Sequence, residues 1–144
     1  NLYSSFAIGN FVKAYSKEEA EKTLIENKIV ILVGGLGNPL FTTDSTASVR
    51  AVELNSDIML KATTVDGIYS DDPKINKKAI KYDFLTFDEA ITKNLKVMDQ
   101  TSLCFCRDNN LDVRVFNADS QGAILEAITN ENTKIGTLVR LKND

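Results

Sequence analysis

Residues able to bind a ligand are concentrated in Val33–Ala47, whose sequence is VGGLGNPLFTTDSTA. It follows Ile29–Val33, a β-branched apolar run that predicts a buried central strand of a parallel sheet. Thr42 and Thr43 can cap a following helix, predicted over Asp44–Leu54. Glycines between a strand and a helix let the backbone approach a ligand, and a helix N-terminus offers N–H groups to an anion. Because open α/β sheets bind ligands at such strand ends, this segment is a predicted site.

The glycines of this segment do not form a known phosphate-binding fingerprint. Leu40 stands where a dinucleotide-binding loop needs its third glycine, and no Gly-Lys-Ser/Thr follows as in a Walker A loop. A tight turn without function is the alternative interpretation. Asn38, Thr42, Thr43 and Asp44 favour a site, because they combine donors and acceptors for a polar ring with a carboxylate for a cation or lysine.

A second polar cluster follows the apolar run Asp57–Ala62, which predicts another buried strand. Its members are Thr63, Asp66, Tyr69, Asp71 and Asp72. A hydroxyl, an aromatic ring and carboxylates can hold a base and ribose hydroxyls, but a solvated Asp-Gly and Asp-Pro turn explains the acidic residues equally well. Asp99 is similarly open between a helix N-cap and a site residue.

Helices and strands are predicted to alternate along the chain. Ser16–Glu19 and Thr86–Glu89 are capping boxes that predict helix starts. The remaining expectations are helices over 16–27, 44–54 (apolar face Ala47, Val49, Val52 and Leu54), 86–91, 99–109 and 120–129, and strands over 82–85, 112–116 and 136–141. This alternation requires right-handed βαβ units, hence an α/β fold with a layered sheet in one domain.

Composition excludes several classes of function. The 144 residues carry a net charge of −3 with no basic block, which argues against a nucleic-acid binder. The absence of histidine excludes a histidine triad, base or zinc site. No apolar run reaches the roughly 20 residues that span a bilayer, and no signal peptide is visible. Cys104 and Cys106 are expected to be reduced structural cysteines, on different helix faces, in a cytoplasmic protein, with metal binding as the alternative. Arg50, Arg107 and Arg114 are expected in surface ion pairs.

Four motifs occur in an order that resembles the bacterial uridylate kinases. Gly35–Ala47 (GLGNPLFTTDSTA) is similar to their uridine-ring segment, and Leu60–Pro73 (LKATTVDGIYSDDP) to their ATP-binding stretch. Leu95–Asp99 (LKVMD) and Val113–Asn117 (VRVFN) resemble two further landmarks, and Gly136–Val139 matches the closing strand. The resemblance implies the amino-acid kinase fold, a three-layer open, mainly parallel sheet between helices. It also implies transfer of the γ-phosphoryl group of ATP to UMP, with Mg²⁺.

The resemblance also assigns site residues. It implies that the UMP pocket is lined by Gly37, Asn38, Pro39, Leu40, Phe41, Thr42 and Thr43. It implies ATP contacts from Thr63, Tyr69 and Asp72, with Asp66 in the same loop. Asp44 matches the acidic residue that organises the transferring phosphoryl group and its lysine. One departure is Leu36, where the family commonly has a threonine near the uracil.

Further expectations follow from what the resemblance covers. The chain resembles the C-terminal portion of a single amino-acid kinase domain over residues 1–144, without the lysine and glycine motifs with which the family begins. We therefore expect these residues alone to be inactive. The family further implies a hexamer, with GTP and UTP as effectors. The alternatives are a non-catalytic nucleotide-binding or oligomerisation module of the same fold, and a kinase of this fold that phosphorylates a carboxylate or carbamate.

Overall fold

The computed structural model describes residues 1–96, 98–130 and 132–142. The chain divides into two compact units, residues 1–56 and 57–144. The first contains the glycine-rich segment and the second contains the Thr63–Asp72 cluster. The single-domain assignment stays a prediction. Val97, in the motif Leu95–Asp99, lies outside the described residues.

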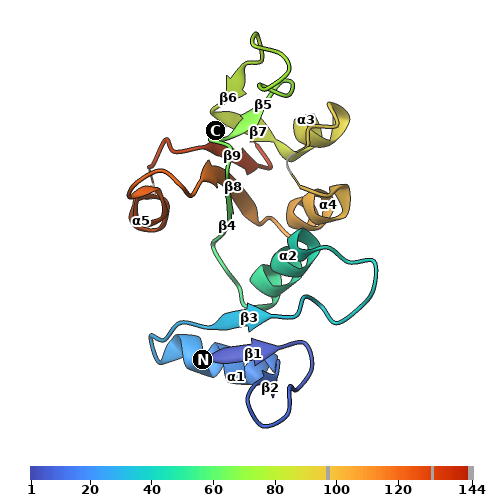
Figure 1. Ribbon diagram of the computed structural model, residues 1–144, viewed down its shortest axis with the longest axis vertical. Coiled ribbons are helices and arrows are strands. Elements are labelled where there is room, and N and C mark those ends of the chain that lie inside the picture. The colour runs from blue at the N-terminus through green and yellow to red at the C-terminus, as the bar shows by residue number, and fades with distance from the viewer. Residues whose placement is uncertain (97, 131, 143–144) are drawn as a thin grey trace. The chain divides into compact units, whose positions relative to one another are not determined.

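The first unit is built on three short parallel strands, β1 (Leu2–Ser4), β2 (Lys13–Ala14) and β3 (Ile31–Val33), in the order β2-β1-β3. Its helices are α1 (Lys17–Ile25) and α2 (Thr43–Glu53), both visible in the blue and cyan part of the ribbon (Figure 1). Parallel strands need a crossover connection, and α1 supplies the one between β2 and β3.

Helix α1 packs on β1 through Tyr3, which is 4% exposed. The Tyr3 hydroxyl lies 3.2 Å from Thr23 Oγ1, so the buried phenol keeps a hydrogen-bonding partner. Helix α1 begins as predicted, since Ser16 accepts a hydrogen bond from the Glu19 N–H at 3.3 Å. These contacts fix β1 relative to the helix.

Two predictions of burial in this unit are wrong. Strand β3 begins at Ile31, and Ile31 and Val33 are 55% and 41% exposed because β3 is the edge strand of its three-stranded sheet. On α2, Ser45 and Ser48 are buried while Ala47 is exposed. The Ser48 hydroxyl donates to the Asp44 carbonyl at 2.9 Å, so this polar side chain can be buried with its hydrogen bond made.

The second unit contains a four-stranded sheet in the order β4-β8-β9-β7. Its strands are β4 (Ile58–Thr63), β7 (Phe84–Thr86), β8 (Asp112–Asn117) and β9 (Thr137–Arg140). The pairs β4·β8 and β7·β9 are parallel, and β8·β9 is antiparallel. A separate hairpin of β5 (Ile68–Tyr69) and β6 (Lys81–Tyr82) was not predicted as such.

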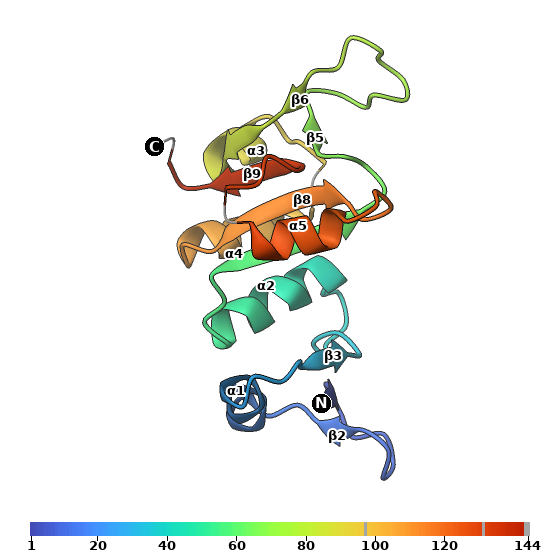
Figure 2. The same ribbon diagram turned by 90° about the vertical axis from the view of Figure 1, so that its left-hand side faces the viewer.

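Helices cover both faces of this sheet. The views in Figures 1 and 2 place α5 (Ala123–Thr129) on one face, and α3 (Phe87–Thr92) and α4 (Gln100–Asp108) on the other. The prediction of a three-layer, mainly parallel α/β fold is therefore confirmed. The core of the unit lies around β8, which has four consecutive buried residues. Strand β4 is at the sheet edge and buries only Met59, so the prediction of a buried strand over 57–62 is wrong for most of its length.

The helix ends of the second unit follow the predicted caps. Thr86 and Glu89 form a reciprocal capping box at the start of α3. Asp99 caps α4 by accepting a hydrogen bond from the Ser102 N–H at 2.8 Å, which confirms its capping role. Cys106 is buried and Cys104 half-buried on α4, and neither forms a disulfide.

Candidate functional site

The glycine-rich loop of the first unit runs from the end of β3 at Val33 to the start of α2 at Thr43. Its backbone is left-handed at Gly34, Gly35, Gly37 and Leu40, with φ between +63° and +77°. At Gly37 a side chain is also sterically opposed, since a Cβ would lie 3.0 Å from the Ser5 Cβ. The loop therefore passes close to the end of β1, and glycine allows that approach.

Ser5, directly after β1, is hydrogen-bonded to this loop. Its N–H donates to the Val33 carbonyl at 3.3 Å, and its hydroxyl donates to the Gly34 carbonyl at 2.9 Å and also reaches the Gly35 carbonyl. The sequence analysis missed Ser5, because a serine 30 residues before the loop carries no local signal. Ser5 comes next to the loop through the pairing of β1 with β3, which places Ser4 opposite Val33.

Apolar side chains at the tip of the loop face solvent. Leu40 and Phe41 are exposed, and Asn38 and Pro39 beside them are exposed too. Leu36, the residue that departs from the family pattern, is half-buried. An exposed aromatic ring beside backbone donors is suited to stacking on a planar ring.

The loop ends at the N-terminus of α2. Thr42 is the N-cap and accepts from the Ser45 N–H at 3.1 Å, which confirms the predicted cap. Asp44, half-buried, lies in the first turn, where a negative charge is favoured by the helix dipole. Arg50 holds the other end of α2: its guanidinium lies 2.6 Å from Glu53 and 3.7 Å from the centre of the Tyr15 ring. All seven predicted UMP residues and Asp44 thus lie in one continuous segment of one unit.

In the second unit, the predicted ATP residues start at the carboxyl end of β4. Thr63 is paired in register with Asn117, the last residue of β8, and its carbonyl accepts from the Ala118 N–H at 2.9 Å. The ends of two neighbouring parallel strands therefore meet at Thr63 and Asn117. This is the edge at which α/β sheets bind ligands.

Asp66 and Tyr69 are in contact after this strand end. The Tyr69 hydroxyl donates to Asp66 Oδ1 at 2.8 Å, and Lys81 Nζ lies 3.8 Å from Asp66 Oδ2. The hydrogen bond to Asp66, followed by desolvation, raises the pKa of Tyr69, so the hydroxyl stays a donor at neutral pH. The exposed Asp72 lies further along the hairpin and accepts from the Lys74 N–H at 2.8 Å.

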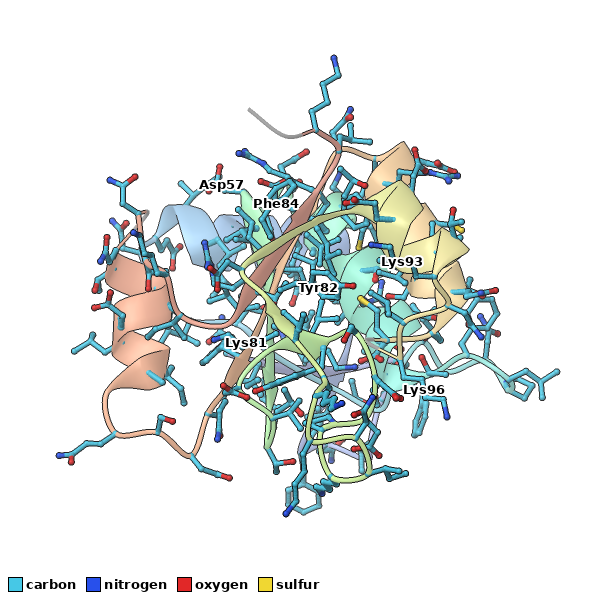
Figure 3. The ribbon with its side chains drawn as sticks, turned by 90° about the horizontal axis from the view of Figure 1, so that it is seen from above. Asp57, Lys81, Tyr82, Phe84, Lys93 and Lys96 are labelled. Atoms are coloured by element: carbon cyan, nitrogen blue, oxygen red, sulfur yellow. The ribbon has the colours of Figure 1, made fainter. Side chains whose placement is uncertain are left out.

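The two residues of β6, Lys81 and Tyr82, contact different side chains. Lys81 reaches Asp66, whereas the Tyr82 ring lies 5.1 Å from Lys93 Nζ (Figure 3). Successive side chains of a strand point to opposite faces, which explains this division. Lys81 therefore belongs to the Asp66 side of the hairpin and Tyr82 to the α3 side.

A pocket of about 460 Å³ opens beside Asp66 and Lys81. Its other lining residues are Asn117, Ser120, Gln121, Gly122, Ala123, Glu126, Lys134, Ile135 and Gly136. Of the four predicted ATP residues, only Asp66 lines the pocket. Tyr69 donates a hydrogen bond to Asp66, and Thr63 is paired with the lining residue Asn117. Asp72 is not among the lining residues. The sequence analysis missed the walls at 117–126 and 134–136, although Asn117 ends a strand as Thr63 does.

Close backbone packing builds the wall at Gly136. With φ at +72°, a Cβ there would overlap the Val115 carbonyl oxygen and lie 2.8 Å from the Phe116 Cβ. Arg114 supports the same wall: it is 6% exposed and donates to the Ile135 carbonyl at 2.9 Å. The predicted surface role of Arg114 is therefore wrong, and burial lowers its pKa.

The described residues contain no group of three or more histidine, cysteine, aspartate or glutamate side chains that could hold a metal ion. None of the described helices is long and apolar enough to cross a membrane.

The sequence matches the amino acid kinase family over residues 4–117. Uridylate kinases of Alcanivorax borkumensis and Coxiella burnetii are each 45% identical to it over 138 residues, which is 96% of this chain and 54% and 56% of theirs. The chain thus spans about half the length of these curated relatives. UMP kinase from Bacillus anthracis superposes with a TM-score of 0.94 at 36% identity, over 99% of this chain and 58% of that chain. For UMP kinase from Ureaplasma parvum the TM-score is 0.89 at 40% identity, over 96% and 59%.

Proposed function

The chain belongs to the amino acid kinase family, and we propose that the protein of which it is part transfers the γ-phosphoryl group of ATP to UMP. A phosphate oxygen of UMP forms a bond to the γ-phosphorus, the bond from that phosphorus to the β,γ-bridging oxygen breaks, and ADP and UDP result. The observation that carries this proposal is the glycine-rich loop, which has a left-handed backbone at Gly34, Gly35, Gly37 and Leu40 and ends at the α2 N-terminus with Asp44 in the first helical turn.

In this proposal the glycine-rich loop binds UMP. Gly37–Thr43 supply exposed backbone and the Phe41 ring for the uridine, which needs a planar surface and polar groups around its carbonyls. The named uridylate kinase relatives support this ligand. The half-buried Leu36 has no hydroxyl to offer the uracil, so we place recognition of the base on the backbone and on Asn38.

Asp44 acts on the phosphoryl transfer. A carboxylate repels the negatively charged phosphates, so its useful role is to hold a cationic group in the orientation that neutralises the transferring phosphoryl. Its place in the first helical turn puts the carboxylate beside the end of the glycine-rich loop. Phosphoryl transfer depends on positioning and charge stabilisation, and an organising carboxylate serves both.

We assign ATP to the carboxyl end of β4 and the hairpin that follows. Thr63, Asp66, Tyr69 and Asp72 are the proposed contacts, and the pocket beside Asp66 offers space for part of the nucleotide. Lys81 and Lys134 line this pocket and can approach phosphate oxygens, although Asp66 and Glu126 balance their charge in the lining. Mg²⁺ is expected with ATP. In nucleotide sites Mg²⁺ is held mainly by phosphate oxygens and water, with one or two carboxylates. The described residues contain no group of three or more side chains that could hold a metal ion, and we assign Mg²⁺ no ligand in this chain.

Several finer proposals come from the family alone. We propose that residues 1–144 are the C-terminal nucleotide-binding portion of a single amino acid kinase domain. A hexameric assembly, a cytoplasmic location and control by GTP and UTP are proposed on the same basis. The non-catalytic module remains the alternative if the intact protein lacks kinase activity.

The proposed reaction is tested with the full-length protein that contains this chain. ADP release is measured with ATP and Mg²⁺ in the presence of UMP, of CMP and of no acceptor, and UDP is identified as the product. UMP-dependent ADP release well above both controls is the expected result. Equal rates with and without UMP would contradict the proposal and favour the non-catalytic module.

A further inference from the structure

We propose that Ser5 is a positioning residue for UMP: its hydroxyl shares its one proton between two carbonyls of the glycine-rich loop and so turns the loop amides toward the nucleotide. The inference rests on the proposed binding of UMP by this loop. Ser5 lies directly after β1, outside the residues that the family resemblance assigns to the site.

Ser5 is hydrogen-bonded to the start of the glycine-rich loop through both its hydroxyl and its N–H. The hydroxyl lies 2.9 Å from the Gly34 carbonyl oxygen and also contacts the Gly35 carbonyl oxygen. The Ser5 N–H donates to the Val33 carbonyl at 3.3 Å, which extends the β1·β3 pairing to the start of the loop. One residue therefore engages three successive carbonyls where the strand becomes a loop.

Peptide geometry determines where the N–H groups of this loop point. In a planar trans peptide the carbonyl of one residue and the N–H of the next point in opposite directions. Because the Gly34 and Gly35 carbonyls face Ser5, the N–H groups of Gly35 and Leu36 face away from it. Those two amides are then available to oxygen atoms of UMP.

The two peptides that Ser5 holds belong to glycines, whose backbone is intrinsically mobile. Gly34 and Gly35 both have positive φ, a region that glycine enters and leaves at little cost. Without the Ser5 hydroxyl these two peptides have more conformational freedom, and ordering them then costs part of the free energy of UMP binding. Loss of the hydroxyl should therefore weaken UMP binding selectively.

Ser4 supplies a matched control at the adjacent position. Its hydroxyl is unpartnered among the described residues, and the residue is 1% exposed. Ser4→Ala therefore removes the same atom type from the same strand end without breaking a hydrogen bond, which is neutral or stabilising. Any effect shared by both variants belongs to the strand end and not to the loop carbonyls.

The test compares Ser5→Ala, Ser4→Ala and the unmodified full-length protein in the ADP-release assay, well below their unfolding temperatures. We expect Ser5→Ala to raise the KM for UMP about tenfold, the scale of one lost hydrogen bond plus loop ordering. The KM for ATP should stay within about twofold, and Ser4→Ala should match the unmodified protein in both.

Two results would overturn the inference: a UMP KM unchanged by Ser5→Ala, or an equal rise in the KM for ATP. The second would indicate a general structural role for Ser5. Failure of the proposed function is distinguishable, because the unmodified protein would then show no UMP-dependent turnover at all.

Discussion

The glycine-rich loop and the pocket of the second unit are built in opposite ways. The loop is a single segment whose shape comes from its own positive-φ backbone, with Ser5 as its contact from outside. The pocket is assembled from four segments, around Asp66, Lys81, Asn117 and Gly136, which lie up to 70 residues apart. A local change should therefore alter ligand binding at the loop and stability at the pocket.

The largest expected effect is on the stability of the protein, from a substitution at Gly136 in the pocket wall. Gly136→Ala places a Cβ against the Val115 carbonyl and in a left-handed backbone. We expect a loss of about 3 kcal/mol or more of unfolding free energy, from backbone strain and overpacking together. Denaturant titration of the full-length protein measures it.

Gly122→Ala is the matched control for the wall. Gly122 has φ of +78°, and a Cβ there would meet nothing within 4 Å among the described residues. Only the backbone term of about 1 kcal/mol applies. Equal losses from the two variants would show that close packing at Gly136 does not hold the wall.

Asp44 tests whether the loop end is catalytic. Asp44→Asn keeps size and hydrogen bonding but removes the charge, so kcat should fall at least about a hundredfold with little change in either KM. Asp88→Asn is the control, since Asp88 also lies in the first turn of its helix, paired with Arg107 at 3.2 Å. A kcat for Asp44→Asn near that of Asp88→Asn would make Asp44 a helix-start residue only.

The smallest expected effect is on the KM for ATP, and it distinguishes the two faces of the β5·β6 hairpin. Tyr69→Phe removes the hydrogen bond to Asp66 and should raise the KM for ATP about threefold. Tyr82→Phe, on the Lys93 side, should leave it unchanged. The pKa of Tyr69 is raised above 10.0, so the difference between the two variants should be constant from about pH 7 to 9. A difference that disappears within this range would contradict the assignment of the hydroxyl as a donor.

The glycine-rich loop and the helix starts could be predicted from sequence, because the residues that determine them are close together in the chain. Thr42, Asp99 and the Thr86 capping box act on residues three positions away, and each was confirmed. Burial was predicted less well. The apolar run before the loop does not reveal that Ile31 lies on an edge strand, since that depends on pairing with distant residues.

The pocket was largely missed for the same physical reason. Asn117 and Gly136 meet Asp66 through the β4·β8·β9 pairing and through the hydrogen bond from the Ile68 N–H to Thr137, and no spacing in the sequence encodes these contacts. For Arg114 the sequence predicted exposure where the structure shows burial. An arginine within a strand resembles a surface residue until the fold buries it against the Ile135 carbonyl.

The most direct test of the account is whether the two regions serve different substrates. It measures the KM for UMP and for ATP in Phe41→Ala, at the loop tip, and in the double variant Tyr69→Ala, Asp72→Ala, at the hairpin, both in the full-length protein. We predict that Phe41→Ala raises the KM for UMP about tenfold, as expected for a lost stacking surface, and leaves ATP within about twofold. The hairpin variant should show the reverse. A parallel rise in both KM values for either variant, or the crossed pattern, would contradict the assignment of UMP to the loop and ATP to the hairpin.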